Sequence, residues 1–362
     1  MTSVAPSVDI ASQPSRAATQ APLSALELAL TKLAVRWHRL THWEFWPSAA
    51  VYPPLLPFIA WYAIRSGGLS TGALCNPSID LGGFVGESKS DILSQLPSWA
   101  VVPTCLIPAG DLHARWTTVE SFLQRESLNF PIILKPDIGE RGTGVRLIDN
   151  PSSAKTHLTR NPSPLVAQAF HPGPYEAGIF YVRLPDEARG RIFSITDKKF
   201  ASLTGDGSST LHDLIWRHPR LRLQAPVFLQ RLGVRAGDIP AAGQTVPLGI
   251  AGNHCRGTLF LDGHALITPA LTGVIDSIAK HAPGIFFGRF DIRYTDPGEL
   301  RAGRGFKLVE LNGLLSESTN IYDPKYGYWQ AQRILREQWG LAFEIGRQNL
   351  KRGTLRPRLS HI

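Results

Sequence analysis

The sequence predicts an α+β protein, and three observations support this. From residue 88 to about residue 350, strand-like runs alternate with helical stretches, a mixture that is typical of α/β and α+β enzymes. Apolar residues make up 43% of the chain and charged residues 19%, which excludes a disordered chain and a polytopic membrane protein. The length of 362 residues allows two or three domains, at roughly 100–200 residues per domain.

The chain is basic and poor in cysteine. Lys and Arg number 38 against 29 Asp and Glu, and the net charge of +9 leaves anionic small molecules, anionic lipid and nucleic acid open as partners. Nucleic acid is the least favoured of these, because no RNP, KH or helix-turn-helix signature is found. Cys75, Cys105 and Cys255 lie far apart without a CxxC pair, which indicates neither a disulfide framework nor a zinc site. A cytoplasmic location fits best.

The N-terminal region has two parts. Residues 1–21 are rich in Ser, Ala, Pro and Thr, which predicts a disordered start and no signal peptide. Residues 24–40 predict a helix with Ser24 as its N-cap and Glu27 completing a capping box. The helix either packs on the core or lies on a membrane surface, where its cations would face anionic headgroups. Its apolar face holds Leu26, Leu30, Leu33, Trp37 and Leu40, and Lys32, Arg36 and Arg39 lie opposite.

The next 20 residues, 45–64, carry no charge, and their length alone would allow them to span a bilayer. Prolines disfavour a span, because lipid cannot replace the backbone hydrogen bonds that they remove. Aromatic residues in and just before the segment suit a membrane interface. Three interpretations stay open: a wrap buried against the protein body, a peripheral patch on the inner membrane and, least favoured, a true span. The residues concerned are Pro47, Pro53, Pro54 and Pro57, and Trp43, Trp46, Tyr52, Trp61 and Tyr62.

Beyond residue 88, hydrophobic periodicity predicts the elements in order. We expect helices at residues 89–96, 117–125, 209–217, 271–281 and from 323 to about 350. We expect strands at residues 101–106, 131–135, 165–170, 177–183, 286–294 and 305–311.

One candidate site is a phosphate cradle in the run PIILKPDIGERGTGV, residues 131–145. Lys135 ends a strand, and Gly139, Gly142 and Gly144 follow at once. Glycines let backbone N–H groups approach oxyanions, and a lysine at the end of a strand adds a fixed positive charge. The alternative is an ordinary glycine turn of a β-hairpin.

A second candidate site combines Asp291 with Glu310 and Asn312. Glu310 and Asn312 are two residues apart and point to the same face of one strand, and Asp291 can lie across from them. Oxygen ligands of this kind suit a Mg²⁺ ion that bridges phosphates. Arg289 precedes Asp291 by two residues and can stabilise developing negative charge. The alternative is a set of edge-strand carboxylates that face water.

Together the two sites resemble the ATP-grasp superfamily, over residues 88–325. The resemblance implies that a nucleotide lies between two α+β subdomains, residues 88–168 and 169–325. Residues 22–87 are then an atypical N-terminal segment, and residues 326–362 a C-terminal helix with a basic tail. The resemblance also implies ATP and Mg²⁺, which Mn²⁺ can replace. The reaction it implies activates a carboxylate as an acyl phosphate and joins it to an amine or a thiol, with release of ADP and phosphate.

The resemblance further assigns roles to single residues. It implies ATP contacts at Lys89, Lys135, Gly142, Thr143, Gly144, Gln168, Glu176 and Lys198. It implies Arg289 and Arg256 as the catalytic arginines, and Asp291, Glu310 and Asn312 as metal ligands. Gln168 would meet adenine, Glu176 the ribose and Lys198 the γ-phosphate. Residues 204–215 resemble the GDGxxTI segment of cyanophycin and glutathione synthetases, and NHCRG, 253–257, resembles the NxxRGG stretch of ribosomal-protein glutamate ligases. ELNGLLSEST, 310–319, replaces the ExNxxPG loop of D-alanine–D-alanine ligases.

Several other residues have a plainer interpretation. Asp206 fits a turn or a helix cap, and His254 and Cys255 fit a structural role because no paired Cys/His ligand set accompanies them. A basic stretch either forms a solvated face or binds an anionic substrate or lipid. It comprises Arg217, Arg220, Arg222, Arg231 and Arg235. The chain is thus predicted to be a ligase for small-molecule carboxylates and amines. The alternative is a membrane- or RNA-associated binding protein with a vestigial nucleotide site.

Overall fold

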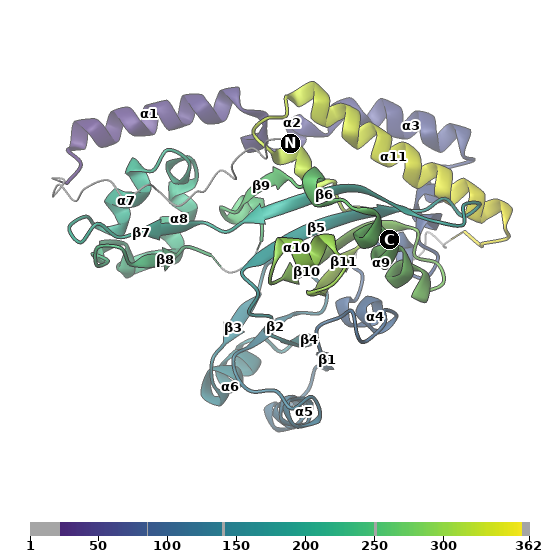
Figure 1. The fold of residues 1–362 in the computed structure, drawn as a ribbon, viewed down its shortest axis with the longest axis horizontal. Coiled ribbons are helices and arrows are strands. Elements are labelled where there is room, and N and C mark those ends of the chain that lie inside the picture. Colours follow the sequence, from purple (N-terminus) through teal and green to yellow (C-terminus); the bar gives the residue numbers. More distant parts are fainter. Residues whose placement is uncertain (1–21, 85, 140–141, 250–251, 357–362) are drawn as a thin grey trace. The chain divides into compact units, whose positions relative to one another are not determined.

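The computed structural model describes residues 22–84, 86–139, 142–249 and 252–356. The chain divides into two units, which are treated separately (Figure 1). The first combines residues 1–47 with 199–259, and the second combines 48–198 with 260–362. Each unit therefore joins segments that are far apart in the sequence. The boundaries expected after residues 87, 168 and 325 stay a prediction, and the expected disordered start, residues 1–21, lies outside the described residues.

The first unit is built around one long helix. Helix α1 begins with the expected capping box, in which the Ser24 side chain accepts from the backbone N–H of Glu27 and the Glu27 side chain accepts from that of Ser24. It packs through Val35 and Leu28 onto a core of small helices and a two-stranded sheet. The elements of this unit are α1 (Ala25–Thr41), β7 (Ser202–Thr204), α7 (Leu211–Arg217), α8 (Ala225–Leu232) and β8 (Thr245–Pro247).

The orientation of α1 corrects the expectation for its basic side. Lys32 Nζ lies 5.5 Å from the centroid of the Trp216 ring, and the Arg39 guanidinium lies 5.6 Å from that of Phe45. These two cations therefore lie against the unit, and the Leu and Trp stripe points to solvent. The sequence pattern identifies both faces, but the packing of Val35 decides which of them is covered.

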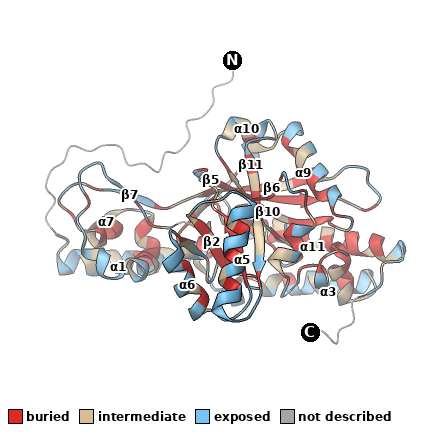
Figure 2. Ribbon diagram, turned by 90° about the horizontal axis from the view of Figure 1, so that it is seen from below, coloured by how far each residue is buried: buried red, intermediate tan, exposed pale blue. Residues whose placement is uncertain are grey.

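The second unit contains a five-stranded sheet in the order β11-β10-β5-β6-β9. One face is apolar and packs on α9 and α4. The other face is apolar only at one end, where Phe180, Val182 and Phe287 lie under α11. Figure 2 shows the strands of this sheet largely in red, as buried residues. The elements are β5 (Tyr175–Val182), β6 (Arg191–Lys199), β9 (Leu259–Asp262), β10 (Phe287–Tyr294), β11 (Phe306–Asn312), α4 (Lys89–Ser94), α9 (Pro269–His281), α10 (Pro297–Arg301) and α11 (Tyr328–Lys351).

A smaller sheet of the second unit has the order β1-β4-β2-β3, with antiparallel neighbours throughout. Val119 and Phe122 of α5 and Leu158 of α6 cover one of its faces. Antiparallel sheets with helices on their faces confirm the α+β class. The elements are β1 (Thr104–Ile107), α5 (Leu112–Arg125), β2 (Ile132–Pro136), β3 (Arg146–Ile148), α6 (Pro151–Arg160) and β4 (Leu165–Ala169).

The proline-rich aromatic segment folds into short helices, α2 (Ser48–Val51) and α3 (Leu56–Arg65). Tyr62 of α3 packs near Phe343 of α11, with 6.2 Å between the ring centroids. Trp46 and Trp61 are exposed, whereas Trp43 is buried in the first unit, so the expected interfacial set is only partly at the surface. Within the described residues, every helix is too short or too polar to cross a bilayer.

Candidate functional site

The strands β5, β6, β10 and β11 bring charged side chains to one face of the larger sheet. Glu176 of β5 is paired with Arg293 of β10 and with Lys198 of β6. Asp291 of β10 is paired with Glu310 of β11. Directly opposed residues of neighbouring strands point to the same face, and so do residues two apart on one strand. The structure therefore brings the predicted carboxylates together. They lie at the polar end of this face, away from the apolar end that packs against α11.

Asp291 is the centre of this charged face. Its Oδ1 lies 2.9 Å from Arg289 Nε and 3.0 Å from Lys198 Nζ, and its Oδ2 lies 3.3 Å from Asn312 Nδ2. Burial alone would raise the pKa of Asp291, but the two cations outweigh it and hold the pKa below its ordinary value. Removing Asp291 would leave Arg289 without its ion-pair partner and buried Lys198 with Glu176 as its remaining carboxylate.

Gly178 of β5 makes room for this pair. It lies opposite Asp291 in the register, and a Cβ at this position would sit 2.9 Å from Arg289 Cδ and 3.0 Å from Asp291 Oδ1. A larger residue would therefore push the arginine and the carboxylate apart. The glycine in the run YEAGIFYV is explained by this close approach rather than by backbone strain.

A second ion-pair cluster lies at Glu176. Lys198 Nζ is 2.9 Å from Glu176 Oε1, and Arg293 Nε is 3.2 Å from Glu176 Oε2. Burial would lower the pKa of Lys198, but Asp291 and Glu176 outweigh it and raise that pKa. Arg293 was not among the predicted site residues. Its spacing could have revealed it, because Arg289, Asp291 and Arg293 occupy alternate positions of one strand and so point to the same face.

Lys135 reaches the same region from the smaller sheet. Its Nζ donates to Gln168 Oε1 at 3.1 Å and to the backbone O of Val309 in β11 at 3.0 Å. Burial lowers the pKa of Lys135, and Lys89 lowers it further against the opposing pull of Glu310. Among the described residues no carboxylate forms a salt bridge with Lys135, whose contacts are the neutral oxygens just given. A buried ammonium of this kind is stabilised by an anionic ligand.

Lys89, at the start of α4, joins the loop after β2 to β11. Its Nζ donates to the backbone O of Gly139 at 2.5 Å and lies 3.9 Å from Glu310 Oε1. Gly142 and Gly144 follow with φ of +67° and +75°, a backbone conformation that favours glycine. Thr143 lies between them, and residues 140–141 lie outside the described residues. The expected cradle thus has its two lysines near the same carboxylate, Glu310.

Glu317, in the loop after β11, was not predicted. Arg289 donates to its backbone O at 3.2 Å, and the Tyr322 hydroxyl donates to its Oε2 at 3.0 Å. Burial raises the pKa of Glu317 to about 7, although the Tyr322 hydroxyl acts in the opposite direction. This carboxyl therefore changes its charge near neutral pH beside the candidate site. The sequence held no signal for it, because a glutamate in a loop has no periodicity to reveal its burial.

The side chains of the face leave positive charge in excess. Five cations accompany three carboxylates of the sheet, so an anion fits better than a cation as the ligand of the whole face. The cations are Lys89, Lys135, Lys198, Arg289 and Arg293, and the carboxylates are Glu176, Asp291 and Glu310.

A magnesium ion fits one part of this face by the chemistry of its donors. In the portion of the chain that the structure describes, no group of three or more His, Cys, Asp or Glu is placed to hold a metal. However, Asn312 lies beside Asp291, to which its Nδ2 donates, and its side chain also carries an amide oxygen; Mg²⁺ accepts a mixture of carboxylate and amide oxygens. Lys89 Nζ lies 3.9 Å from Glu310 Oε1, and the side chain of Glu310 is 30% exposed, which leaves the oxygens of Glu310 open to a ligand.

In the first unit, Arg256 and His254 belong to a 3-10 turn, His254–Arg256. Arg256 therefore lies in a different unit from Arg289. Buried Glu44 accepts from Arg220 at 2.8 Å and lies 3.2 Å from His254 Nε2. Burial opposes ionisation of Glu44, but hydrogen bonds from His254 and Arg220 lower its pKa to about 2. These contacts give His254 a structural role, one of the interpretations left open by the sequence.

The other candidates in the first unit also have local partners. Asp206 accepts from the backbone N–H groups of Ser208 and Ser209 and holds a turn, as its GDG context suggested. Hydrogen bonds from Ser209 lower the pKa of Asp206 to about 2. Four of the five arginines of the basic stretch are engaged within the unit: Arg217 with Ser209, Arg220 with Glu44, Arg231 with the backbone O of Arg256, and Arg235 with Asp238.

Comparisons with known proteins give structural neighbours but no relative in sequence. No protein-family model and no curated protein matches the chain. Among solved structures, the chain is similar to a bifunctional glutathione synthetase from Pasteurella multocida, with 15% identity and a TM-score of 0.37 over 69% of this chain and 35% of that one. It is also similar to the D-cycloserine synthetase DcsG, with 12% identity and a TM-score of 0.39 over 69% and 68%.

A third neighbour is the ATP-grasp ligase PsnB complexed with a minimal precursor, with 13% identity and a TM-score of 0.36 over 69% of this chain and 59% of that one. The chain spans about a third of the length of the glutathione synthetase that it matches. Because the identities and TM-scores are low, the function of the chain is inferred from its own side chains and not from these neighbours.

Proposed function

We propose that the chain is an ATP- and Mg²⁺-dependent ligase of the ATP-grasp kind, whose nucleotide lies on the charged face of the second unit. One observation carries this proposal. Lys135 is a buried ammonium whose contacts are neutral oxygens, and it ends beside β11, the strand that carries Glu310 and Asn312. A phosphate group would compensate Lys135, and the oxygen donors would hold the metal that accompanies the phosphates.

The residues of the face then have separate tasks. Lys135 and Lys89 bind phosphate oxygens, and the glycine loop approaches them through backbone N–H groups. Asp291, Glu310 and Asn312 hold Mg²⁺, which when bound neutralises charge on the phosphates. Gln168 lies next to Lys135 and contacts the base. Glu176 contacts the ribose, and Lys198, already bonded to it, reaches toward the γ-phosphate.

The reaction proposed for this site has two steps. A substrate carboxylate attacks the γ-phosphorus, the bond to ADP breaks, and an acyl phosphate forms. An amine then attacks the acyl carbon, loses a proton, and displaces inorganic phosphate; a thiol is the alternative nucleophile. Arg289 stabilises negative charge in both steps. The catalytic role expected for Arg256, which belongs to the first unit, stays a prediction. Glu317, with a pKa of about 7, is suited to accept the proton of the amine.

The test is release of ADP by the purified full-length chain in the presence of Mg²⁺, ATP and a panel of carboxylates combined with amines and thiols. We expect at least one combination to stimulate ADP release, and Lys135→Ala to abolish it. Lys351→Ala, an exposed lysine in the last turn of α11, is the matched control and should behave as the wild type. Tight ATP binding without ADP release for any combination would favour a binding protein with a vestigial site.

A further inference from the structure

Helix α3 lies at the surface of the second unit although it is apolar on nearly every side. Its sequence is LPFIAWYAIR. Ala63 is buried and Tyr62 packs near Phe343, whereas Trp61 is 54% exposed and Ile64 is 75% exposed. A helix that is apolar all round is normally enclosed by protein or by lipid. Ten residues cannot span a bilayer, so the outer side of α3 is suited to lie in an interface.

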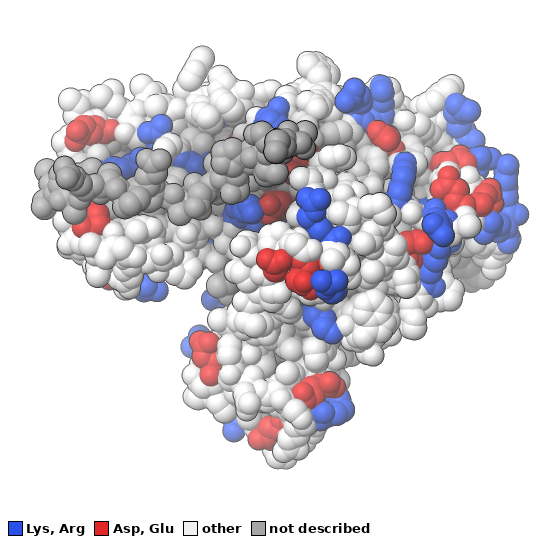
Figure 3. All heavy atoms as spheres, viewed as in Figure 1, with Lys and Arg blue, Asp and Glu red and all other residues white. Residues whose placement is uncertain are grey.

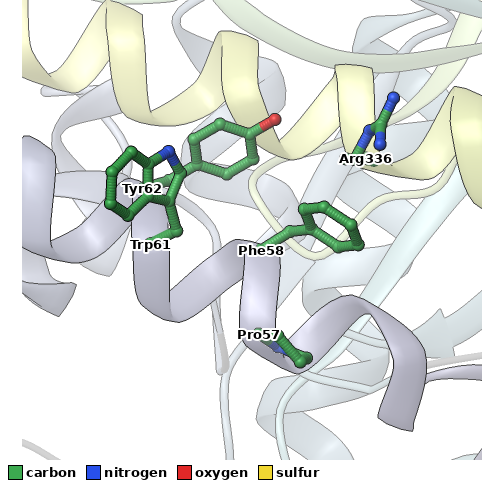
Figure 4. Close-up of a pocket in the computed structure, with 5 residues that line it drawn as sticks. All are labelled: Pro57, Phe58, Trp61, Tyr62 and Arg336. Carbon is green, nitrogen blue, oxygen red and sulfur yellow. The ribbon is translucent and has the colours of Figure 1, made fainter.

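A groove with an aromatic and cationic edge runs between α3 and α11. It has a volume of about 500 Å³ and is lined by Pro57, Phe58, Trp61, Tyr62 and Arg336 (Figure 4). The Arg336 guanidinium lies 5.0 Å from the centroid of the Phe58 ring. Trp329 and Arg333 are also exposed, and they share the side of α11 that carries Arg336 because they are seven and three residues from it.

The charges on this surface are mixed, with arginines in excess. Glu337 is exposed on the side of α11 that carries Arg333, and Glu344 lies beside Arg65 and pairs with Arg347. Residues 48–69 contain a single charged residue, Arg65, and the adjoining side of α11 adds Arg333 and Arg336. Figure 3 shows Lys and Arg side chains together with Asp and Glu side chains at the end where α11 finishes, and Lys351 and Arg352 are exposed there. Tryptophan and arginine around an apolar centre are the side chains that settle at the headgroup level of a bilayer.

The first unit has an exposed apolar surface of its own. The side chains on the outer side of α1 are between 58% and 69% exposed. They recur four or three residues apart, so they form a single stripe along the helix. They are Leu26, Leu30, Leu33, Trp37 and Leu40. A soluble monomer rarely exposes a continuous stripe of this kind without a partner.

We propose that the second unit docks on the surface of an anionic phospholipid bilayer through the outer side of α3 with Trp329. The stripe of α1 in the first unit is a separate apolar surface, suited by itself to the same kind of bilayer. The apolar side chains enter the interface, and Arg65, Arg333 and Arg336 meet the phosphate groups of the lipids. This inference is independent of the proposed ligase activity, because it uses none of the residues of the charged face.

Two other occupants fit these surfaces less well. Residues 1–21 contain few large apolar side chains, Met1, Val4, Val8 and Ile10, which are too few to cover either surface. A second copy of the chain would form a two-fold contact in which each surface meets itself. The excess of arginines over glutamates on this surface would then face its own copy, because Glu337 and Glu344 can pair with only part of it.

The experiment is flotation of the full-length chain with vesicles of equal parts phosphatidylcholine and phosphatidylglycerol, and with vesicles of phosphatidylcholine alone. We expect the chain to float with the anionic vesicles, more weakly with the neutral ones, and less at high salt. The double variant Trp61→Glu/Ile64→Glu should bind the anionic vesicles about tenfold more weakly or worse. Leu30→Glu/Leu33→Glu tests the stripe of α1 in the same way.

Val234→Glu is the matched control, because Val234 is 97% exposed and belongs to neither surface. It should float as the wild type does. The proposal is overturned if the wild type floats with neither composition, or if the paired variants float as well as Val234→Glu. It is also overturned if light scattering shows a dimer that Trp61→Glu/Ile64→Glu converts to a monomer, since the surface would then be a contact between copies.

Discussion

The charged face of the larger sheet and the outer side of α3 both depart from the usual rule that charged side chains face water and large apolar side chains are buried. Asp291, Lys198 and Arg289 bring ionised groups into the interior, whereas Trp61 and Ile64 present large apolar groups to water. Either arrangement is unfavourable unless a compensating group is present. In the first region the charges compensate one another in part. In the second region the Arg65 guanidinium lies 5.8 Å from the centroid of the Trp61 ring, and Trp61 and Ile64 are still 54% and 75% exposed. The comparison suggests that both regions are shaped for something that binds.

The largest effect is expected when the compensation within the charged face is broken. Asp291→Ala would leave Arg289 without its ion-pair partner and Lys198 with Glu176 alone, which should lower the free energy of unfolding by about 3–5 kcal/mol. Denaturation in urea measures this difference. The matched control is Asp186→Ala, which removes an exposed carboxylate from an ion pair with Arg352 and should cost less than about 1 kcal/mol. Equal effects of the two substitutions would show that the charged face is not a coupled interior cluster.

A smaller effect, with a definite dependence on pH, is expected at Glu317. Burial raises its pKa from 4.5 to about 7 in the folded protein. Between about pH 4.5 and pH 7 the folded protein keeps a proton that the unfolded chain has lost, so the contribution of Glu317 to the free energy of unfolding falls as the pH rises through this window.

Glu317→Gln cannot ionise and should therefore be more stable than the wild type at about pH 8. The expected difference in the free energy of unfolding is only on the order of 1–2 kcal/mol, because the Glu317 side chain keeps some contact with solvent. The difference should shrink toward zero as the pH falls to about 4.5. Urea denaturation across this range measures it. A difference that is constant with pH would mean that the carboxyl of Glu317 is not held in the environment described.

The smallest effect is expected on the apolar surfaces. Trp61→Gln and Leu33→Gln change residues that are more than half exposed, so the free energy of unfolding should change by no more than about 0.5 kcal/mol. Thermal denaturation of the two variants beside the wild type measures this. A loss of several kcal/mol would mean that these side chains are packed against protein, which would remove the contrast with the charged face.

Local periodicity was enough to predict much of the second unit. Alternation along β10 and β11 placed Asp291, Glu310 and Asn312 on one face, because residues two apart on a strand share a side and neighbouring strands keep that side in register. The Ser24 and Glu27 capping box predicted the start of α1, because both partners lie within one turn. In each case the residues that decide the structure are close together in the sequence or repeat with a fixed period.

Other features depend on contacts that periodicity does not contain. The strand β6 was not expected, and the ion pairs of Lys198 with Glu176 and Asp291 follow only from its register beside β5. The outward orientation of the α1 stripe depends on the packing of Val35 in the core of the first unit. Burial of Glu317 depends on the fold of a loop. These features depend on contacts between residues that are far apart in the sequence, and a pattern within one segment cannot specify such contacts.

The central claim is that the charged face binds a magnesium–nucleotide complex, and calorimetric titration of the full-length chain with ATP tests it most directly. We expect saturable binding at one site that weakens when Mg²⁺ is left out, is lost in Lys135→Ala and is unchanged in Lys351→Ala. Circular dichroism of each variant provides the check that it is folded. Absence of binding to the folded wild type, or binding by folded Lys135→Ala that equals that of the wild type, would contradict the assignment of this face.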